Sequence, residues 1–135
     1  MEKTFIIDPT KIAKKLIKEI EKNKKLNVIQ KTLLKQIIIQ NPFFISEYEI
    51  KAIIPLDKYT LRFHSRLQGK IKNIDIKYNP IPDLYEIRAY KLKDRLEKIG
   101  DKIIKIPNID EEEIYKNEYV YFDELEKIIR EIVYR

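Results

Sequence analysis

Residues 58–78 read KYTLRFHSRLQGKIKNIDIKY, and the alternation of apolar and polar side chains along them decides the fold of this chain. Leu61, Phe63 and Leu67 fall on one side of an extended strand, and the polar side chains between them fall on the other. The triplet QGK at 68–70 then interrupts the alternation with residues that are typical of a turn. The stretch therefore predicts two strands of an antiparallel sheet.

The same period of two begins upstream of this stretch. Residues 48–55 read YEIKAIIP and predict a preceding strand, because β-branched and aromatic residues alternate with polar ones. The residues LDK at 56–58 form a turn. We therefore expect a meander of three strands, over 48–55, 59–67 and 71–78.

Helical periodicity surrounds the meander. Asp8 and Pro9 are typical of a helix start and predict a helix over 9–25, and Asn27 predicts the cap of a second helix over 28–40. Apolar residues at helical spacing also predict a helix over 83–100, ending at Gly100. The first half of that segment alternates as well, which leaves a strand open as the alternative.

The C-terminal part completes the fold. Residues 102–107 and 118–122 predict two short strands around an acidic loop at 110–113. Asp123 and Glu126 have the spacing of a capping box and predict a last helix. The expected fold class is α+β: one domain over residues 1–135, an antiparallel sheet with helices packed on one face, in the order roughly α-α-β-β-β-α-β-β-α.

Composition excludes several classes of site. The 135 residues contain no cysteine, one histidine and two glycines. Disulfides, zinc sites with thiolate ligands and multi-histidine metal centres are therefore not expected, and a glycine-rich phosphate loop cannot be built. We expect no enzyme, cofactor or metal. A small nuclease that uses His64 is the enzymatic alternative.

Neither a membrane segment nor a secretory leader is expected. The longest apolar run is far shorter than the roughly 18 residues that span a bilayer. The opening residues MEKTFIID lack the apolar core of a cleavable signal. We therefore expect a cytoplasmic protein.

Charge is distributed unevenly along the chain. Residues 1–78 carry 17 Lys and Arg against 8 Asp and Glu, whereas residues 79–135 carry 11 against 14. A basic half of this kind favours an anionic partner such as a nucleic acid. The Ile, Lys, Glu and Tyr bias fits an AT-rich genome, a heat-adapted source, or both.

The candidate binding residues follow from the strand alternation. The polar side chains that alternate with Leu61 and Phe63 form one face of the strand. Residues of the neighbouring strands and turns widen this face. Arginine contributes bidentate phosphate contacts, lysine contributes charge, and a tyrosine ring stacks on bases. The expected nucleic-acid-binding residues are Lys51, Tyr59, Arg62, His64, Arg66, Lys70, Lys72 and Lys77.

The order of the elements, with the patches KYTLRFHS at 58–65 and NEYVYF at 117–122, resembles small proteins of rod-shaped and related viruses of hyperthermophilic archaea. One group of these binds single-stranded DNA without sequence preference, as a dimer with a basic, aromatic-lined groove. The resemblance spans roughly residues 8–122. It implies a basic sheet face around Arg62, His64 and Arg66, used in viral genome replication, repair or packaging.

Other functions are compatible with the same pattern. A winged-helix duplex-DNA-binding regulator would need a short helix around residues 46–52, with 59–78 as its wing. A protein-interaction module would use the basic patch against an acidic protein. A homodimer is suggested by the apolar C-terminal helix, at Leu125, Ile128, Ile129, Ile132 and Val133, and by 118–122 as an edge strand.

Overall fold

The computed structural model describes residues 8–135. The expectation of no secretory leader rests on residues 1–8, and most of these lie outside the described residues. The described chain contains four α-helices, five strands and two short 3₁₀ turns. The helices are α1 (Pro9–Lys22), α2 (Val28–Gln40), α3 (Phe44–Glu47) and α4 (Leu125–Val133). The strands are β1 (Ile50–Asp57), β2 (Thr60–Ser65), β3 (Lys72–Asn79), β4 (Leu84–Ile99) and β5 (Lys102–Val120).

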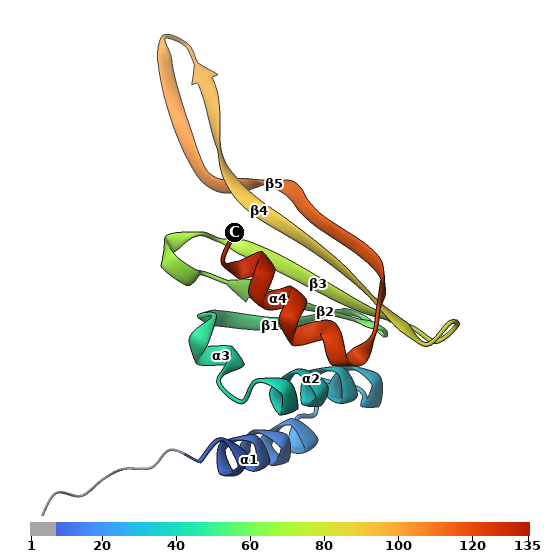
Figure 1. Cartoon of the computed structure of the whole chain (residues 1–135). Coiled ribbons are helices and arrows are strands. Elements are labelled where there is room, and N and C mark those ends of the chain that lie inside the picture. The colour runs from blue at the N-terminus through green and yellow to red at the C-terminus, as the bar shows by residue number, and fades with distance from the viewer. Residues whose placement is uncertain (1–7) are drawn as a thin grey trace, which may run out of the picture.

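The five strands form one antiparallel meander in the order β1-β2-β3-β4-β5, with helices on one of its faces (Figure 1). This arrangement confirms the expected α+β class. α2, α3 and α4 lie against the sheet, whereas α1 packs on the outer side of α2. Among residues 8–135, no helix lies on the opposite face of the sheet (Figure 1).

The register of the central strands follows the alternation read from the sequence. Leu61 lies opposite Ile76 and Phe63 opposite Ile74, and all four side chains are fully buried. Because side chains alternate along a strand, the residues between them point to the uncovered face. The core therefore forms between this sheet face and the helices.

The two predicted helix starts are confirmed. The Asp8 carboxylate accepts a hydrogen bond from the Thr10 N–H at 3.0 Å. Asn27 and Gln30 form a reciprocal capping box: each side-chain oxygen accepts from the backbone N–H of the other residue, at 2.9 and 3.0 Å. Such caps satisfy N–H groups that the first turn of a helix leaves free.

The helix expected over 83–100 is wrong, because residues 84–99 form the long strand β4. Tyr85, Ile87 and Ala89 are buried on the core face, as the alternation in this segment allowed. Pairing with β3 on one side and β5 on the other outweighs the helical spacing of the apolar residues. The acidic run 110–113, expected as a loop, lies within β5.

The segment that precedes β1 also differs from the expectation. Phe44–Glu47 forms a single helical turn, and the strand begins at Ile50 rather than at Tyr48. Glu49 has φ +46°, a left-handed conformation that turns the chain from this helix into the strand. The helix around 46–52 that a winged-helix arrangement needs is not formed, and residues 60–65 and 72–79 are central strands rather than a wing.

The predicted C-terminal helix is present, but its apolar face is occupied. Leu125, Ile128, Ile129, Ile132 and Val133 are all buried in the core of their own domain. This face is therefore not free for a second copy of the chain. The expected capping box of Asp123 and Glu126 does not form, because α4 begins at Leu125 with no side-chain cap.

Beyond the body of the sheet, β4 and β5 continue as a two-stranded arm (Figure 1). The pairing changes register between Lys93 and Arg95 on β4, where Pro107 and Asn108 lie in an extra stretch of β5. Asn108 has φ +53°, and such a bulge bends a ribbon. The arm ends in a two-residue turn at 100–101, where Gly100 has φ +61°.

In the described part of the chain, no helix is long and apolar enough to cross a membrane.

Candidate nucleic-acid interface

The uncovered face of the sheet presents two rows of polar side chains across β2, β3 and β4. Arg62, Asp75 and Arg88 pair in one row, and His64, Asn73 and Tyr90 in the next. A strand places the residues of adjacent rows roughly 6.6–6.8 Å apart. This arrangement brings cations, amides and one aromatic ring together on a single surface, which we call the open face.

Arg62 lies at the centre of the open face. Its Nε and Nη2 atoms donate to the two carboxylate oxygens of Asp75 at 2.7 and 2.9 Å, and Nη1 lies 3.5 Å from Glu111. The Asp75 carboxylate raises the pKa of Arg62 above its usual value. The guanidinium also lies 5.9 Å from the centre of the Tyr90 ring. Arg62 is therefore held in a fixed plane beside an aromatic ring.

His64 and Arg66 extend this network toward the end of β2. The His64 Nδ1 atom lies 2.7 Å from Asn73 Oδ1, and Arg66 Nε donates to His64 Nε2 at 3.2 Å. These contacts orient the His64 ring between Asn73 and Arg66. Arg66 is exposed and makes no ion pair within residues 8–135.

A shallow hollow of about 300 Å³ opens on the same face beside Arg62. Lys77, Arg88 and Tyr90 contribute to its wall. Arg88 pairs with Glu86 at 3.0 Å. The residues that line the hollow are Leu56, Asp57, Thr60, Asp75, Lys77, Glu86, Arg88 and Tyr90.

Arg88 and Tyr90 were missed by the sequence prediction, because a helix was expected where β4 lies. The signal that would have found them is the alternation of Tyr85, Ile87 and Ala89, which places Glu86, Arg88 and Tyr90 on the opposite face. Asp75 is the one acidic residue in the stretch 58–78 and was not among the predicted site residues. Its place directly opposite Arg62 depends on the strand register, which the structure supplies.

Three of the predicted residues lie away from the centre of the open face, and one of them, Lys70, donates to the Arg135 backbone oxygen at 3.5 Å, next to the end of α4. Lys51 is exposed at an irregularity of the edge strand β1. Tyr59 lies in the turn between β1 and β2, where the Lys58 ammonium lies 5.4 Å from its ring centre. Lys70 is exposed in the connection between β2 and β3. None of the three joins the central network.

Lys72 is the predicted residue that the structure places elsewhere. It points to the helix-covered side of the sheet, with only 2% of its surface exposed. Its ammonium donates to the backbone oxygens of Ile132 and Val133, in the last turn of α4, at 2.7 and 3.2 Å. It also donates to the backbone oxygen of Arg135, just beyond the helix, at 3.0 Å. Burial lowers the pKa of Lys72 below the usual lysine value. Lys72 therefore caps a helix C-terminus and lies out of reach of a phosphate on the open face.

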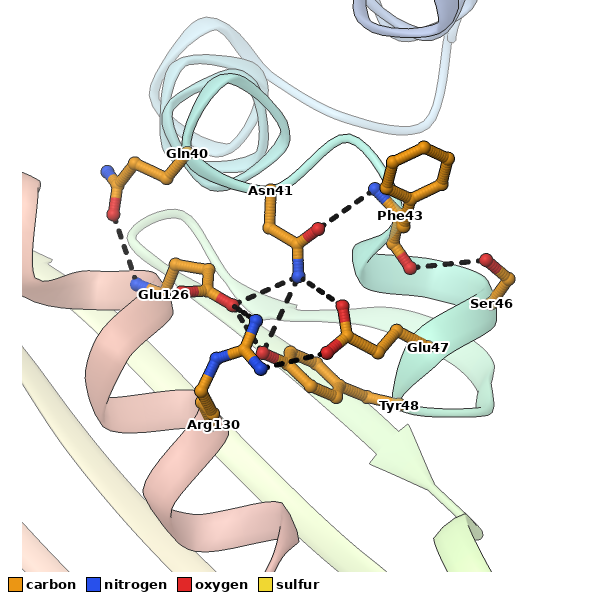
Figure 2. Close-up of polar contacts among 8 residues, drawn as sticks. All are labelled: Gln40, Asn41, Phe43, Ser46, Glu47, Tyr48, Glu126 and Arg130. Atoms are coloured by element: carbon orange, nitrogen blue, oxygen red, sulfur yellow. Dashed lines mark hydrogen bonds and ion pairs between the residues drawn. The ribbon is translucent and has the colours of Figure 1, made fainter. Parts of the chain in front are cut away.

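A second polar cluster joins α3 and α4 to the end of α2 (Figure 2). The Asn41 side-chain amide donates to Glu47 at 2.9 Å and to Glu126 at 3.0 Å, and the Tyr48 hydroxyl donates to Glu126. Arg130 pairs with both carboxylates at 2.9 and 3.1 Å. Burial raises the pKa of Tyr48, with Glu126 adding to the shift.

The bonds within this second cluster account for its polar atoms. No side-chain polar atom that is buried in residues 8–135 lacks a hydrogen-bond partner. Nor does the described chain bring together three His, Asp or Glu side chains that could hold a metal ion. The cluster therefore links α2, α3 and α4 through side-chain hydrogen bonds and ion pairs.

The lysines of α1 form a separate basic surface. Lys11, Lys14, Lys15, Lys18 and Lys22 are exposed on a helix that packs outside α2, away from the open face (Figure 1). Lysine-rich outer faces of this kind supply charge without base-stacking groups. A variant that loses three of these lysines is a matched control for variants of the open face.

The chain matches no protein-family model, and no curated protein or solved structure matches it either.

Proposed function

We propose that this protein binds single-stranded nucleic acid, DNA in particular, without sequence preference across the open face. The observation that carries the proposal is that helices cover only one side of the sheet, while Arg62, Lys77, Arg88 and Tyr90 gather on the other. Exposed sheet faces with aromatic and cationic residues are a recurrent platform for unpaired bases. The resemblance drawn from the sequence extends the proposal to viral genome replication, repair or packaging.

Bases would stack at the centre of the open face. The Asp75 carboxylate accepts hydrogen bonds from two N–H groups on one edge of the Arg62 guanidinium. Because that edge is occupied, we expect the flat face of the guanidinium to contact a base. Tyr90 lies beside it and provides an aromatic ring. Stacking on such groups tolerates any base, which explains binding without sequence preference.

Phosphates would lie along the margins. Arg66 and Lys77 are exposed, and Arg88 is held by a partly exposed pair with Glu86. A phosphate would compete with Glu86 for the Arg88 guanidinium, whose side chain is 42% exposed. Arg66 lies beyond the end of β2, Lys77 lies near the end of β3, and Arg88 lies in the row of Arg62 between them. Together they would define the path of the backbone.

The first prediction tests the phosphate contacts. The triple variant Arg66→Ala, Lys77→Ala, Arg88→Ala should weaken binding to a single-stranded oligonucleotide. It should also reduce the slope of log affinity against log salt by about two, because each lost contact with a single strand removes roughly 0.7. Fluorescence anisotropy at several salt concentrations, with matched single- and double-stranded oligonucleotides, measures both quantities.

The matched control removes three lysines from α1. The variant Lys11→Ala, Lys14→Ala, Lys18→Ala loses the same charge and should keep the wild-type slope. A larger loss in this control than in the sheet variant would move the binding site to α1. Equal affinity for single and double strands would contradict the single-strand proposal, and no binding of either at low salt would overturn nucleic-acid binding altogether.

The second prediction tests stacking at Tyr90. Tyr90→Ala should lower affinity for a single strand by 1–3 kcal/mol, roughly 5- to 150-fold, because base–aromatic stacking has about this magnitude. Tyr90→Phe keeps the ring and should bind nearly as tightly as the wild type. If both variants bind equally, Tyr90 is not a stacking platform.

A further inference from the structure

The distal arm, which we define as residues 93–106, exposes more apolar surface than an isolated ribbon should. Leu96 and Ile103 are 70% and 71% exposed, and Ile99 is 61% exposed. The arm bends away from the body of the sheet, and no helix covers it (Figure 1). A two-stranded ribbon is marginally stable in water unless a further strand or a packed face supports it. The arm therefore has the character of an interface.

One edge of the arm is a free strand edge. The pairing of β3 with β4 ends at Lys91, and the Leu92 N–H donates to the Ile71 carbonyl at 3.1 Å. Because hydrogen-bonding directions alternate along an antiparallel strand, Asp94, Leu96 and Lys98 present their N–H and C=O groups to the same side. Among residues 8–135, no strand pairs with that edge beyond Leu92.

The residues along this edge are complementary to themselves when reversed. The sequence Asp94-Arg95-Leu96-Glu97-Lys98 carries the charges minus, plus, none, minus and plus. An antiparallel copy centred on Leu96 places Leu96 opposite the partner's Leu96, and Arg95 opposite the partner's Glu97. It also places Asp94 opposite the partner's Lys98. Every charged residue of the five then meets its opposite.

The hydrogen-bonding phase of the backbone permits this register, and the charges select it among the registers of the same phase. Hydrogen-bonded pairs form where both residues present their groups to the partner, as Leu96 does in a pairing centred on itself. Shifting the centre by one residue in either direction keeps this phase but places Arg95 opposite the partner's Arg95, or Glu97 opposite the partner's Glu97. Like charges directly opposite each other are unfavourable, so both shifted registers are disfavoured.

We propose that the distal arm is a homodimer interface, in which β4 of one copy pairs antiparallel with β4 of a second copy around Leu96. The result is a four-stranded sheet in the order β5-β4-β4-β5, with a two-fold axis through the central leucine pair. Strand addition of this kind satisfies the free backbone groups. The self-complementary charges favour a second copy of this chain over an unrelated strand. The inference does not depend on nucleic-acid binding.

The third prediction tests this interface by charge reversal and exchange. Lys98 makes no ion pair within the described chain, so Lys98→Glu changes the interface without breaking a pair inside its own arm. The variant places two carboxylates opposite each other, twice per dimer. Its dissociation constant should rise about tenfold or more above that of the wild type. Sedimentation equilibrium of the full chain over a dilution series measures this constant.

A complementary variant provides the rescue. Asp94→Lys should also weaken self-association, because it places two lysines opposite each other, and it removes as well the contacts of Asp94 with Lys105 and with the Asn108 N–H inside the arm. In an equimolar mixture of the two variants, the new carboxylate at position 98 meets the new ammonium at position 94, and association should return close to the wild-type level. A variant that merely failed to fold could not be rescued in this manner.

Lys102→Glu is the matched control. It has the same charge change on the same arm, but Lys102 pairs with Ile99 on the β5 side. This variant should associate as the wild type does. A wild-type chain that stays monomeric at every concentration overturns the proposal. So does a mixture that fails to associate, or an equal loss of association in Lys102→Glu.

Discussion

Phe44→Ala is expected to lower the free energy of unfolding by about 3–5 kcal/mol, the range that applies to truncation of a buried phenylalanine. The Phe44 ring is fully buried. It meets Phe63 edge-to-face at 5.2 Å between ring centres, and Tyr48 at 5.8 Å. Truncation therefore leaves a cavity where α3 contacts the central strand. Chemical denaturation followed by circular dichroism measures the loss.

The neighbouring residue provides the control. Phe43 is 36% exposed and lies at the start of the same helical turn, so Phe43→Ala should cost much less than Phe44→Ala. Equal destabilisation by the two variants would contradict the assignment of Phe44 as the contact between α3 and the sheet. The pair also tests a position that sequence periodicity did not single out.

Lys72→Ala is expected to lower the free energy of unfolding by about 2–3 kcal/mol and to leave nucleic-acid affinity unchanged. The variant removes the ammonium group that donates to three carbonyl oxygens at the end of α4. Hydrogen bonds made by charged groups contribute roughly this amount, and the carbonyls lose their buried partner. Denaturant titration and fluorescence anisotropy on the same preparation separate the two effects.

Lys77→Ala should show the opposite pattern. Lys77 lies on the same strand but is exposed on the open face, where it lines the hollow. Its removal should change stability by no more than about 0.5 kcal/mol, as is usual for surface positions, and should weaken single-strand binding. If Lys72→Ala weakened binding without loss of stability, Lys72 would belong to the binding surface, as the sequence had suggested.

Strand periodicity was a good guide where one face of the strand is buried and neighbouring strands pair with it. Leu61 and Phe63 were expected in the core and Arg62 and His64 on the opposite face, as the structure has them. In the segment 83–100 two periodicities competed. The spacing of Tyr85, Leu92 and Ile99 suits a helix, and only the pairing partners on both sides decide for a strand.

The character of the candidate site was harder to predict than its position. A basic stretch was expected to give a basic face, yet register places Asp75 against Arg62, and Glu111 reaches the same guanidinium from β5. The face is therefore mixed in charge, with free cations at its margins. The contribution of Tyr90 could not be foreseen while β4 was expected as a helix.

By itself the sequence determined the α+β class, the capped helices α1 and α2, and the two-sided character of β2, because each of these depends on residues close together in the chain. Tertiary structure alone decided which partner each charge meets. Lys72 follows the turn of the quoted stretch 58–78, and its position there suggested a phosphate ligand. Instead alternation along β3 places its side chain on the core face with Ile74 and Ile76, and there its ammonium donates to the backbone at the end of α4. Contacts between residues about 60 positions apart leave no local pattern from which to infer them.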